Sequence, residues 1–535
     1  MNENQAKVLE NRIASFPGET WEQVIDRVTD KVVSCEEPHV AREMKRDYTE
    51  IMSNMWFLPN SPCLRNFGAN EGNGSACFVL PIKDSRKSIF KTLSDAVEVQ
   101  ALGGGTGFNF SALRPKGALI STTKGTASGP LSFIGVFDYT VGNVIAQGGV
   151  RKGANMAVLN VEHPDIVDFI QAKAVEGVFS NFNFSVGISN KFMTAVINDA
   201  TWTMSHPKSD VVKTMPAREL WDMIVTQAHH NGEPGIVFLD TINADNPYEA
   251  IEATNPCGEQ PLPPHTSCVL GSLNLRAIPP EKMAFVVRTA VRFLDSIISV
   301  NTYPVPEIEE RTKYYRNIGL GVMGYHDWLI HRNLIYGSDE ALEITETLFS
   351  SIELIARSAS LELAELKGEA PCSPGRRNAN ITTVAPTGSL SMLADCSAGI
   401  EPYFAFEYQK RCMDEVITMK ASIMDEAYNE DTLVTASEVS PIDHLLTQAA
   451  VQEFIDAGIS KTINLPNDAT VEDVKHLYEQ AWAIGCKGLT VYRDGSRDVQ
   501  AQEVEKCPEC GAPLVKTEGC VTCSDPECGY SACSI

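Results

Sequence analysis

Apolar and polar residues follow one another along this chain in two different patterns. Apolar residues return every three or four positions from Glu19 to Val33, which predicts an amphipathic helix. From Asn181 to Ser189 large apolar and small polar residues alternate, which predicts a strand. Further helices are expected over 216–230, 281–300 and 338–366, and buried strands over 76–80 and 236–239. This alternation of helices and strands predicts an α/β fold with largely parallel strands.

One stretch that lacks any hydrophobic periodicity is Asn255-Pro256-Cys257-Gly258-Glu259. Its proline and glycine, and the prolines that follow, predict a loop. The loop places a carboxamide, a thiol and a carboxylate close together. A thiol is easily oxidised and a carboxylate can take up or release a proton, so this combination favours a catalytic site. A turn with one buried structural cysteine is the alternative, and a second thiol, Cys268, follows eleven residues later.

Composition and charge exclude several functions. The chain has 535 residues, of which 43% are apolar and 21% charged, as in ordinary globular proteins. Its net charge of −25 argues against binding to nucleic acid or to an anionic membrane, although a local basic pocket remains allowed. The polar N-terminus and the lack of a long apolar run predict a cytoplasmic protein without a signal peptide or a membrane span.

Three further loops contain residues suited to a phosphate or a close backbone approach. The glycines of Gly103–Gly107 fit neither a P-loop nor a dinucleotide motif, but they let another segment approach the backbone. The loop over 147–153 contains Arg151 and Lys152, which suit either solvent or a phosphate. The turn Pro386-Thr387-Gly388-Ser389-Leu390 offers hydroxyl and backbone N–H groups for a phosphate.

The fifteen cysteines are unevenly distributed, and six of them lie between Cys507 and Cys533. Two Cys-x-x-Cys turns predict a structural Zn²⁺ site with four thiolate ligands, Cys507, Cys510, Cys520 and Cys523. This assignment leaves Cys528 and Cys533 as a terminal pair suited to thiol–disulfide exchange. The alternative ligand set is Cys507, Cys510, Cys523 and Cys528. The polar stretch over 498–506 is expected to be a linker.

Several of these motifs together resemble the catalytic chains of ribonucleotide reductases, and most of all the adenosylcobalamin-dependent class II enzymes. The resemblance runs from about Pro59 to the C-terminus. Its motifs are Asn-x-Cys-x-Glu at 255–259, Ser61-Pro62, Ala76-Cys77, Gly103–Gly107, Cys268, Pro386–Leu390 and Val491–Ser496. It implies a ten-stranded α/β barrel of two half-sheets joined antiparallel, with the Cys257 loop in its centre. The expected organisation is a helical region over 1–55 without an ATP cone, the barrel over 56–497, the linker over 498–506 and the Cys-rich tail over 507–535.

The resemblance also implies a role for each matched residue of the active site. Cys257 would become the thiyl radical that removes the 3′ hydrogen of the substrate. Glu259 would be the base at the 3′ hydroxyl, with Asn255 as its hydrogen-bonding partner. Cys77 and Cys268 would supply the electrons that replace the 2′ hydroxyl, and would end as a disulfide.

Other matched positions are expected to bind ligands or to restore the thiols. Cys528 and Cys533 would reduce the disulfide by exchange and would be reduced in turn by a thioredoxin- or glutaredoxin-like protein. The substrate would contact Ser61, Ala76, Gly105, Pro386, Thr387, Gly388, Ser389 and Leu390. A deoxynucleotide effector would contact Asp84, Ser85, Arg114 and Arg151.

The class II assignment depends on which motifs are present. The Tyr-Tyr pair of this chain, Tyr314-Tyr315, lies in mid-chain, whereas class I enzymes carry theirs near the C-terminus. We therefore expect reduction of ribonucleotides, diphosphates rather than triphosphates, with adenosylcobalamin as cofactor and a monomer or homodimer as the assembly. The alternatives are a class I-like chain that needs a separate radical-generating subunit, and a non-catalytic zinc-ribbon binding protein on the same fold.

Overall fold

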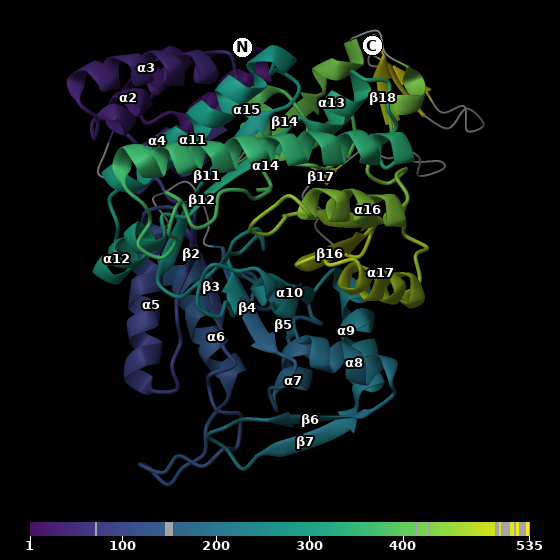
Figure 1. The fold of residues 1–535 in the computed structure, drawn as a ribbon. Coiled ribbons are helices and arrows are strands. Elements are labelled where there is room, and N and C mark those ends of the chain that lie inside the picture. Colours follow the sequence, from purple (N-terminus) through teal and green to yellow (C-terminus); the bar gives the residue numbers. More distant parts are fainter. Residues whose placement is uncertain are drawn as a thin grey trace.

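The computed structural model describes residues 1–69, 72–144, 154–412, 415–425 and 429–497, together with four short strands beyond residue 500. Helices lie outside a central sheet, and the long helix α14 (Asp339–Lys367) crosses one face of the molecule (Figure 1). The sheet contains ten strands, in the order β1-β11-β2-β3-β4-β5-β8-β16-β15, with β12 paired to β11. The predicted α/β fold is therefore confirmed.

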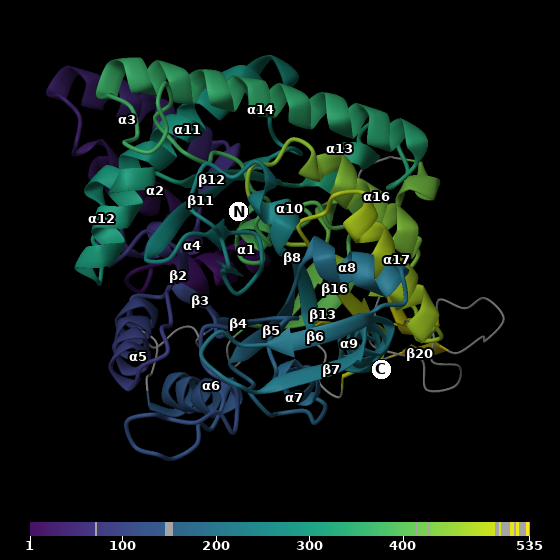
Figure 2. The same cartoon turned by 60° about the horizontal axis from the view of Figure 1, so that its bottom comes forward.

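The first half of the sheet consists of five parallel strands connected by helices. These strands are β2 (Cys77–Val79), β3 (Gly105–Asn109), β4 (Asn155–Asn160), β5 (Phe182–Ile188) and β8 (Gly235–Phe238). The chain passes between them through α5 (Arg86–Ala101), α6 (Pro130–Tyr139), α7 (Ile166–Gln171), α8 (Asn190–Ile197) and α9 (Ala217–Asn231). The hairpin of β6 (Thr201–Ser205) and β7 (Val212–Pro216) lies below α7 and α8 at the bottom of Figure 1 and comes to the front in Figure 2.

The second half contains β11 (Thr266–Asn274) parallel to β12 (Ile318–Met323), and β15 (Thr462–Leu465) parallel to β16 (Gly488–Arg493). Single parallel bridges join Leu320 to Thr382 and Val384 to Ile459, so the segment around Thr383 connects β12 to the residues before β15. Antiparallel pairing of β2 with β11 and of β8 with β16 joins the two halves. The pairings therefore close a barrel of two antiparallel-joined half-sheets, as expected. The strand β1 (Phe57–Pro59) also pairs antiparallel with β11, further along β11 than β2 does.

Alternation along the strands separates the interior of the barrel from the outer cores. Phe78 belongs to an outer apolar cluster beneath the helices, whereas its neighbours Cys77 and Val79 belong to an inner cluster. The inner cluster also contains Met156, Val158, Val237, Cys268 and Leu270. Because successive side chains of a strand point to opposite faces, this alternation directs two thiols into the barrel.

The helices of the N-terminal region pack on the second half of the barrel. Thr20 caps α2 (Trp21–Val33), which buries Trp21, Val24, Ile25, Val28 and Val32 and confirms the predicted amphipathic helix. The other helices there are α1 (Glu3–Val8), α3 (Pro38–Ser53) and α4 (Ser61–Asn66). The predicted helices over 216–230, 281–300 and 338–366 correspond to α9, α11 (Met283–Val300) and α14.

The described residues form several further helices and strands. The helices are α10 (Leu239–Ala244), α12 (Pro306–Tyr315), α13 (Tyr325–Ile330), α15 (Leu390–Ala394), α16 (Pro441–Gln452) and α17 (Val471–Ala483). Short π or 3-10 turns span Leu9–Ile13, Thr140–Val144, Pro280–Lys282, Ser422–Asp425 and Glu430–Thr432. The outlying strands are β9 (Ala253–Thr254), β10 (Pro261–Leu262), β13 (Glu407–Cys412), β14 (Glu415–Lys420), β17 (Gln502–Glu503), β18 (Leu514–Thr517), β19 (Cys520–Cys523) and β20 (Ser531–Cys533). Of the helices that the structure describes, none is long and apolar enough to cross a membrane.

Candidate functional site

The predicted loop lies inside the barrel as the tip of the β9–β10 pair. The amide of Asn255 donates to the carbonyl of Gln260 at 3.1 Å, and Gly258 adopts the left-handed backbone conformation at the tip with φ +81°. Asn183 on β5 donates to the carbonyl of Pro256 at 2.8 Å. Hydrogen bonds to the backbone on both sides therefore fix where the loop presents its side chains.

The barrel wall approaches the loop closely where the strands carry glycine. A Cβ atom on Gly107 of β3 would lie 1.7 Å from the carbonyl oxygen of Thr254, so no larger residue fits there without moving the loop. The stretch Gly103–Gly107, interpreted from the sequence as a loop, is thus largely strand β3. The expected close approach of another segment to these glycines is confirmed, and the segment is Thr254–Pro256 at the start of the predicted loop.

The other half of the barrel holds Glu259 through its main chain. The carbonyl of Glu259 accepts hydrogen bonds from the Thr383 hydroxyl at 2.8 Å and from the amide of Gly458 at 2.9 Å. Sequence reasoning missed Asn183, Thr383 and Gly458. Nothing in their sequence context marks them, because all three of these bonds end on main-chain carbonyls, which every residue carries.

Two of the predicted thiols lie side by side on neighbouring strands. Cys77 on β2 and Cys268 on β11 are directly opposite each other in the antiparallel pairing. Their residues are 4% and 0% exposed, and burial raises the pKa of both thiols well above the ordinary value. Both thiols are therefore protonated at neutral pH. The third thiol, Cys257, is exposed on the loop.

Asn255 joins Cys77 and Glu259 in one buried hydrogen-bonded group. The Asn255 Nδ2 donates to Glu259 Oε2 at 2.7 Å and to Cys77 Sγ at 3.0 Å. The Cys77 thiol donates to Glu259 Oε1 at 3.7 Å. Burial raises the pKa of Glu259 to about 7, although the hydrogen bond from Asn255 opposes this shift. A carboxyl group that titrates near neutral pH can serve as an acid or as a base.

These groups open into a cavity of about 370 Å³. Cys77, Asn255, Cys257 and Glu259 line one part of it. Every residue predicted to contact the substrate also lines it, namely Ser61, Ala76, Gly105, Pro386, Thr387, Gly388, Ser389 and Leu390. Thr387 lies in the left-handed region with φ +49°, and its hydroxyl accepts from the amide of Gly399 at 2.8 Å, which fixes the turn. The structure therefore brings the predicted catalytic and substrate residues together.

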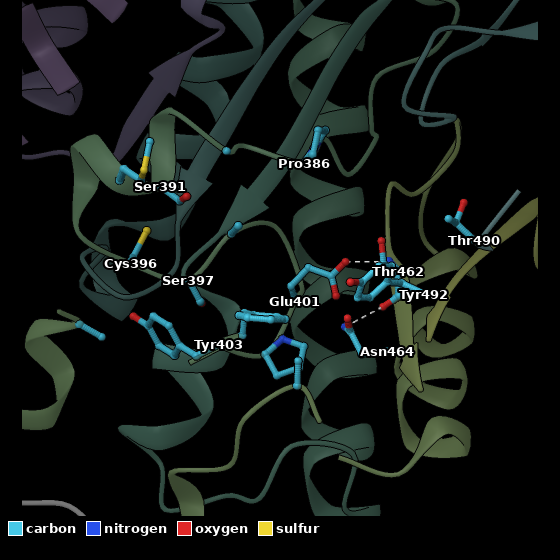
Figure 3. A pocket seen from close by; sticks show the side chains of 18 of the residues that line it. Pro386, Ser391, Cys396, Ser397, Glu401, Tyr403, Thr462, Asn464, Thr490 and Tyr492 are labelled. Carbon is cyan, nitrogen blue, oxygen red and sulfur yellow. Dashed lines mark hydrogen bonds between the residues drawn. The ribbon is translucent and has the colours of Figure 1, made fainter. Parts of the chain in front are cut away.

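Two further cavities adjoin this one. A cavity of about 510 Å³ shares Pro386 and Gly388 with it, and its other lining residues include Ser391, Ser397, Glu401, Thr462, Asn464, Thr490 and Tyr492 (Figure 3). A cavity of about 260 Å³ is also lined by Cys257 and shares Gly232, Thr462, Thr490 and Arg497 with the previous one. Cys257 thus lines two cavities, one of which contains the predicted substrate positions.

The predicted effector residues lie elsewhere and are only partly described. Arg114 pairs with Asp84, with Nε donating to Oδ2 at 3.0 Å. The Ser85 hydroxyl accepts from the amide of Ser88 and so caps α5. Arg151 lies outside the described residues. None of the three described residues lines the cavities above, so effector binding stays a prediction.

The tail cysteines are for the most part outside the described residues. This applies to Cys507, Cys510 and Cys528, and only the backbone is described for Cys520, Cys523 and Cys533, with Cys520 opposite Cys533 in the β19–β20 pairing. Among the described residues, no group of three or more His, Cys, Asp or Glu side chains is arranged to hold a metal ion. The zinc ligands and the redox pair stay predictions.

Comparison with known proteins gives matches over nearly the whole chain. The family model described as ribonucleotide reductase, barrel domain, matches residues 75–373 and 371–492, and the all-alpha domain of the same family matches residues 1–72. A vitamin B12-dependent ribonucleoside-diphosphate reductase of Mycobacterium tuberculosis is 42% identical over 90% of this chain and 77% of its own length. A protein of the same name from Thermoplasma acidophilum is 42% identical over 90% of this chain and 68% of its own length. A vitamin B12-dependent ribonucleotide reductase of Streptomyces coelicolor is 26% identical over 89% of this chain and 63% of its own length.

Proposed function

The chain belongs to the ribonucleotide reductase family, and from that premise we propose that it reduces ribonucleotides to 2′-deoxyribonucleotides with adenosylcobalamin as cofactor. The observation that supports this most directly is that one cavity is lined by an exposed thiol, Cys257, by a carboxyl group that titrates near neutrality, Glu259, and by Cys77. Cys268 lies directly opposite Cys77 on the adjacent strand. The relatives named for ribonucleoside-diphosphate reduction favour diphosphates as substrates.

The reaction begins at Cys257, the thiol exposed on the loop. As a thiyl radical, its sulfur takes the hydrogen atom from C3′ of the ribose, so that an S–H bond forms and a C–H bond breaks. Glu259 in its ionised form accepts the proton of the 3′ hydroxyl, and the hydrogen bond from Asn255 holds its carboxylate in place. The 3′ oxygen can then stabilise the radical at C3′.

The two buried thiols supply what the loss of the 2′ hydroxyl requires. The hydroxyl leaves as water after accepting a proton from Cys77, whose raised pKa keeps it protonated until that moment. Cys77 and Cys268 together give two protons and two electrons and end as a disulfide. The C2′ position gains the hydrogen, Cys257 returns its hydrogen atom to C3′, and Glu259 returns its proton to the 3′ oxygen. The pairing of Cys77 opposite Cys268 on adjacent strands supports this oxidation.

The residues that line the cavity of about 510 Å³ fit the proposed cofactor. When bound, adenosylcobalamin supplies the one-electron oxidation that converts the Cys257 thiol into a thiyl radical. A corrinoid carries carboxamide side chains around a large apolar ring, and such a periphery needs polar hydrogen-bonding partners. The lining offers them as hydroxyl and carboxamide groups of Ser391, Ser397, Thr462, Asn464, Thr490 and Tyr492. These residues would hold the cofactor.

The same proposal includes three finer parts. A deoxynucleotide effector binds near Asp84, Ser85, Arg114 and Arg151. Cys528 and Cys533 reduce the Cys77–Cys268 disulfide and receive electrons from a thioredoxin- or glutaredoxin-like protein. A structural Zn²⁺ is bound by Cys507, Cys510, Cys520 and Cys523. The spacing of the tail cysteines and the resemblance of the matched motifs support these parts.

An activity assay on the purified chain tests the central proposal. With adenosylcobalamin and dithiothreitol, and without a second protein, the chain should reduce a ribonucleoside diphosphate. Cys257→Ser should remove turnover completely because the stronger O–H bond makes serine an unsuitable radical carrier. Cys35→Ser, at an exposed thiol of the N-terminal region, is the matched control and should keep full activity. Turnover only after addition of a second radical-generating protein would support the class I-like alternative instead.

A further inference from the structure

Glu401, in the wall of the cavity of about 510 Å³, forms an ion pair with Lys461 that the reaction steps above do not use. Lys461, the residue before β15, has a fully buried side chain. Its Nζ contacts Glu401 Oε2 at 2.6 Å, His444 Nδ1 at 2.9 Å and the carbonyl of Thr462 at 3.3 Å. An ammonium group has three N–H donors, so each of them has an acceptor here.

The neighbouring histidine shows which way these hydrogen bonds run. His444 Nε2 lies 2.9 Å from the carbonyl of Ala436, which can only accept, so Nε2 carries the hydrogen. Nδ1 is then free to accept from Lys461. Burial, together with the nearby Lys461, lowers the pKa of His444 to about 3, so the imidazole is neutral. The charges of this group are therefore one ammonium and one carboxylate.

Glu401 presents the accepting face of this pair to the cavity. A quarter of its side chain is exposed (25%), and the residue lines the cavity of about 510 Å³ (Figure 3). Its Oε1 accepts the amide of Thr462 at 2.7 Å and its Oε2 accepts Lys461. Each carboxylate oxygen can accept more than one hydrogen bond, so acceptor positions remain on the cavity side.

Two donors of the protein fix the carboxylate of Glu401. The ammonium of Lys461 faces one of its oxygens and the amide of Thr462 faces the other. The buried ammonium also needs its counter-charge, because an unpaired buried charge is costly. The cavity wall at Glu401 is thus a hydrogen-bond acceptor, and a ligand group that meets it must donate.

We propose that Glu401, held by Lys461, is a specificity-determining residue that accepts a hydrogen bond from a peripheral carboxamide of the corrinoid and rejects corrinoids with a carboxylate at that position. The inference rests on the proposed function. A carboxamide offers two N–H donors, whereas a carboxylate is an acceptor only. A site built to accept from a donor discriminates strongly against an analogue that lacks it, because its own polar group is left unpaired.

Binding measurements without turnover test this inference. The probes are hydroxocobalamin and its three monocarboxylic acids, in each of which one propionamide has been hydrolysed, and equilibrium dialysis gives their dissociation constants. For the wild-type chain, at least one of the acids should bind ten- to a hundredfold more weakly than hydroxocobalamin. In the double variant Glu401→Gln/Lys461→Met, which removes both charges together, that acid and hydroxocobalamin should bind within about threefold of each other.

The control and the outcomes separate this inference from the function on which it rests. Glu438→Gln changes an exposed carboxylate that does not line the cavity and should keep the wild-type ratio. Equal ratios in the wild type and the double variant, or no weakened acid at all, would overturn the role of Glu401. If the double variant binds no corrinoid, the single variant Glu401→Gln carries the same comparison. A wild-type chain that binds no corrinoid would instead contradict the proposed function.

Discussion

Replacing Glu259 by glutamine should make the protein more stable at alkaline pH while it removes the base that we propose for the reaction. Glu259 is almost completely buried, and burial raises the pKa of its carboxyl group from 4.5 to about 7. Glutamine has nearly the same shape, and its carbonyl oxygen can still accept from Asn255. The substitution therefore removes the ionisation and leaves the packing in place.

The sign and size of the effect follow from the two pKa values. Below pH 4.5 the carboxyl group is protonated in both the folded and the unfolded chain, and its ionisation has no influence on stability. Between pH 4.5 and 7 the unfolded chain ionises and the folded chain does not, so the wild-type protein loses stability as the pH rises. At 1.36 kcal/mol per pKa unit the full loss is about 3 kcal/mol, reached above pH 7. The glutamine variant does not lose this stability.

Urea unfolding of both proteins at pH 5 and pH 8 measures the effect. The free energy of unfolding of Glu259→Gln should exceed that of the wild type by about 1 kcal/mol at pH 5 and by about 3 kcal/mol at pH 8. Glu346→Gln, at an exposed position of α14, should show the same difference from the wild type at both values. If the difference in the free energy of unfolding between Glu259→Gln and the wild type does not increase with pH, the argument that burial raises the pKa of Glu259 is refuted. Turnover should fall by about 10²-fold or more.

The periodicity of apolar residues located the long elements well. The predicted helix over 338–366 and α14 (Asp339–Lys367) differ by one residue at each end, because a serine cap and a glycine after the last turn mark both ends in the sequence. The strand predicted over Asn181–Ser189 is β5 (Phe182–Ile188). Such elements can be predicted from the sequence because the spacing of their buried apolar residues repeats over a short stretch of the chain.

The loop Asn255–Glu259 could be found from the sequence, but its surroundings could not. Proline and glycine mark the loop, and its thiol and carboxylate mark its chemistry. What fixes Glu259 in space, however, is the Thr383 hydroxyl and the amide of Gly458, both distant in sequence. The position of Cys77 opposite Cys268 is likewise a matter of strand register, which no local pattern specifies. Only the family resemblance linked those two thiols.

The stretch Gly103–Gly107 shows a second reason why the sequence did not predict part of the fold. Dense glycine normally indicates a loop, because glycine lowers the stability of a strand. Here the strand is stabilised by parallel pairing with β2 on one side and β4 on the other, and the missing side chain at Gly107 makes room for Thr254. Tertiary contacts therefore override the local preference at the place where the loop enters the barrel.

Two further predictions concern electron supply and the support of the loop. Replacing Cys528 and Cys533 by serine should allow one turnover and then stall the chain, with activity restored by small dithiols but not by thioredoxin, as measured by product per chain. Lys487→Met should lower kcat more than tenfold and move the pH dependence of kcat, whereas Lys475→Met, which breaks a surface ion pair, should change neither. Lys487 Nζ donates to the carbonyls of residues 455, 456 and 457, and the next residue donates its amide to the carbonyl of Glu259. Without these bonds that segment can shift, and the burial that sets the pKa of Glu259 shifts with it. A variant with reduced stability but an unchanged pH profile would show that Lys487 supports only the fold, and would contradict this prediction.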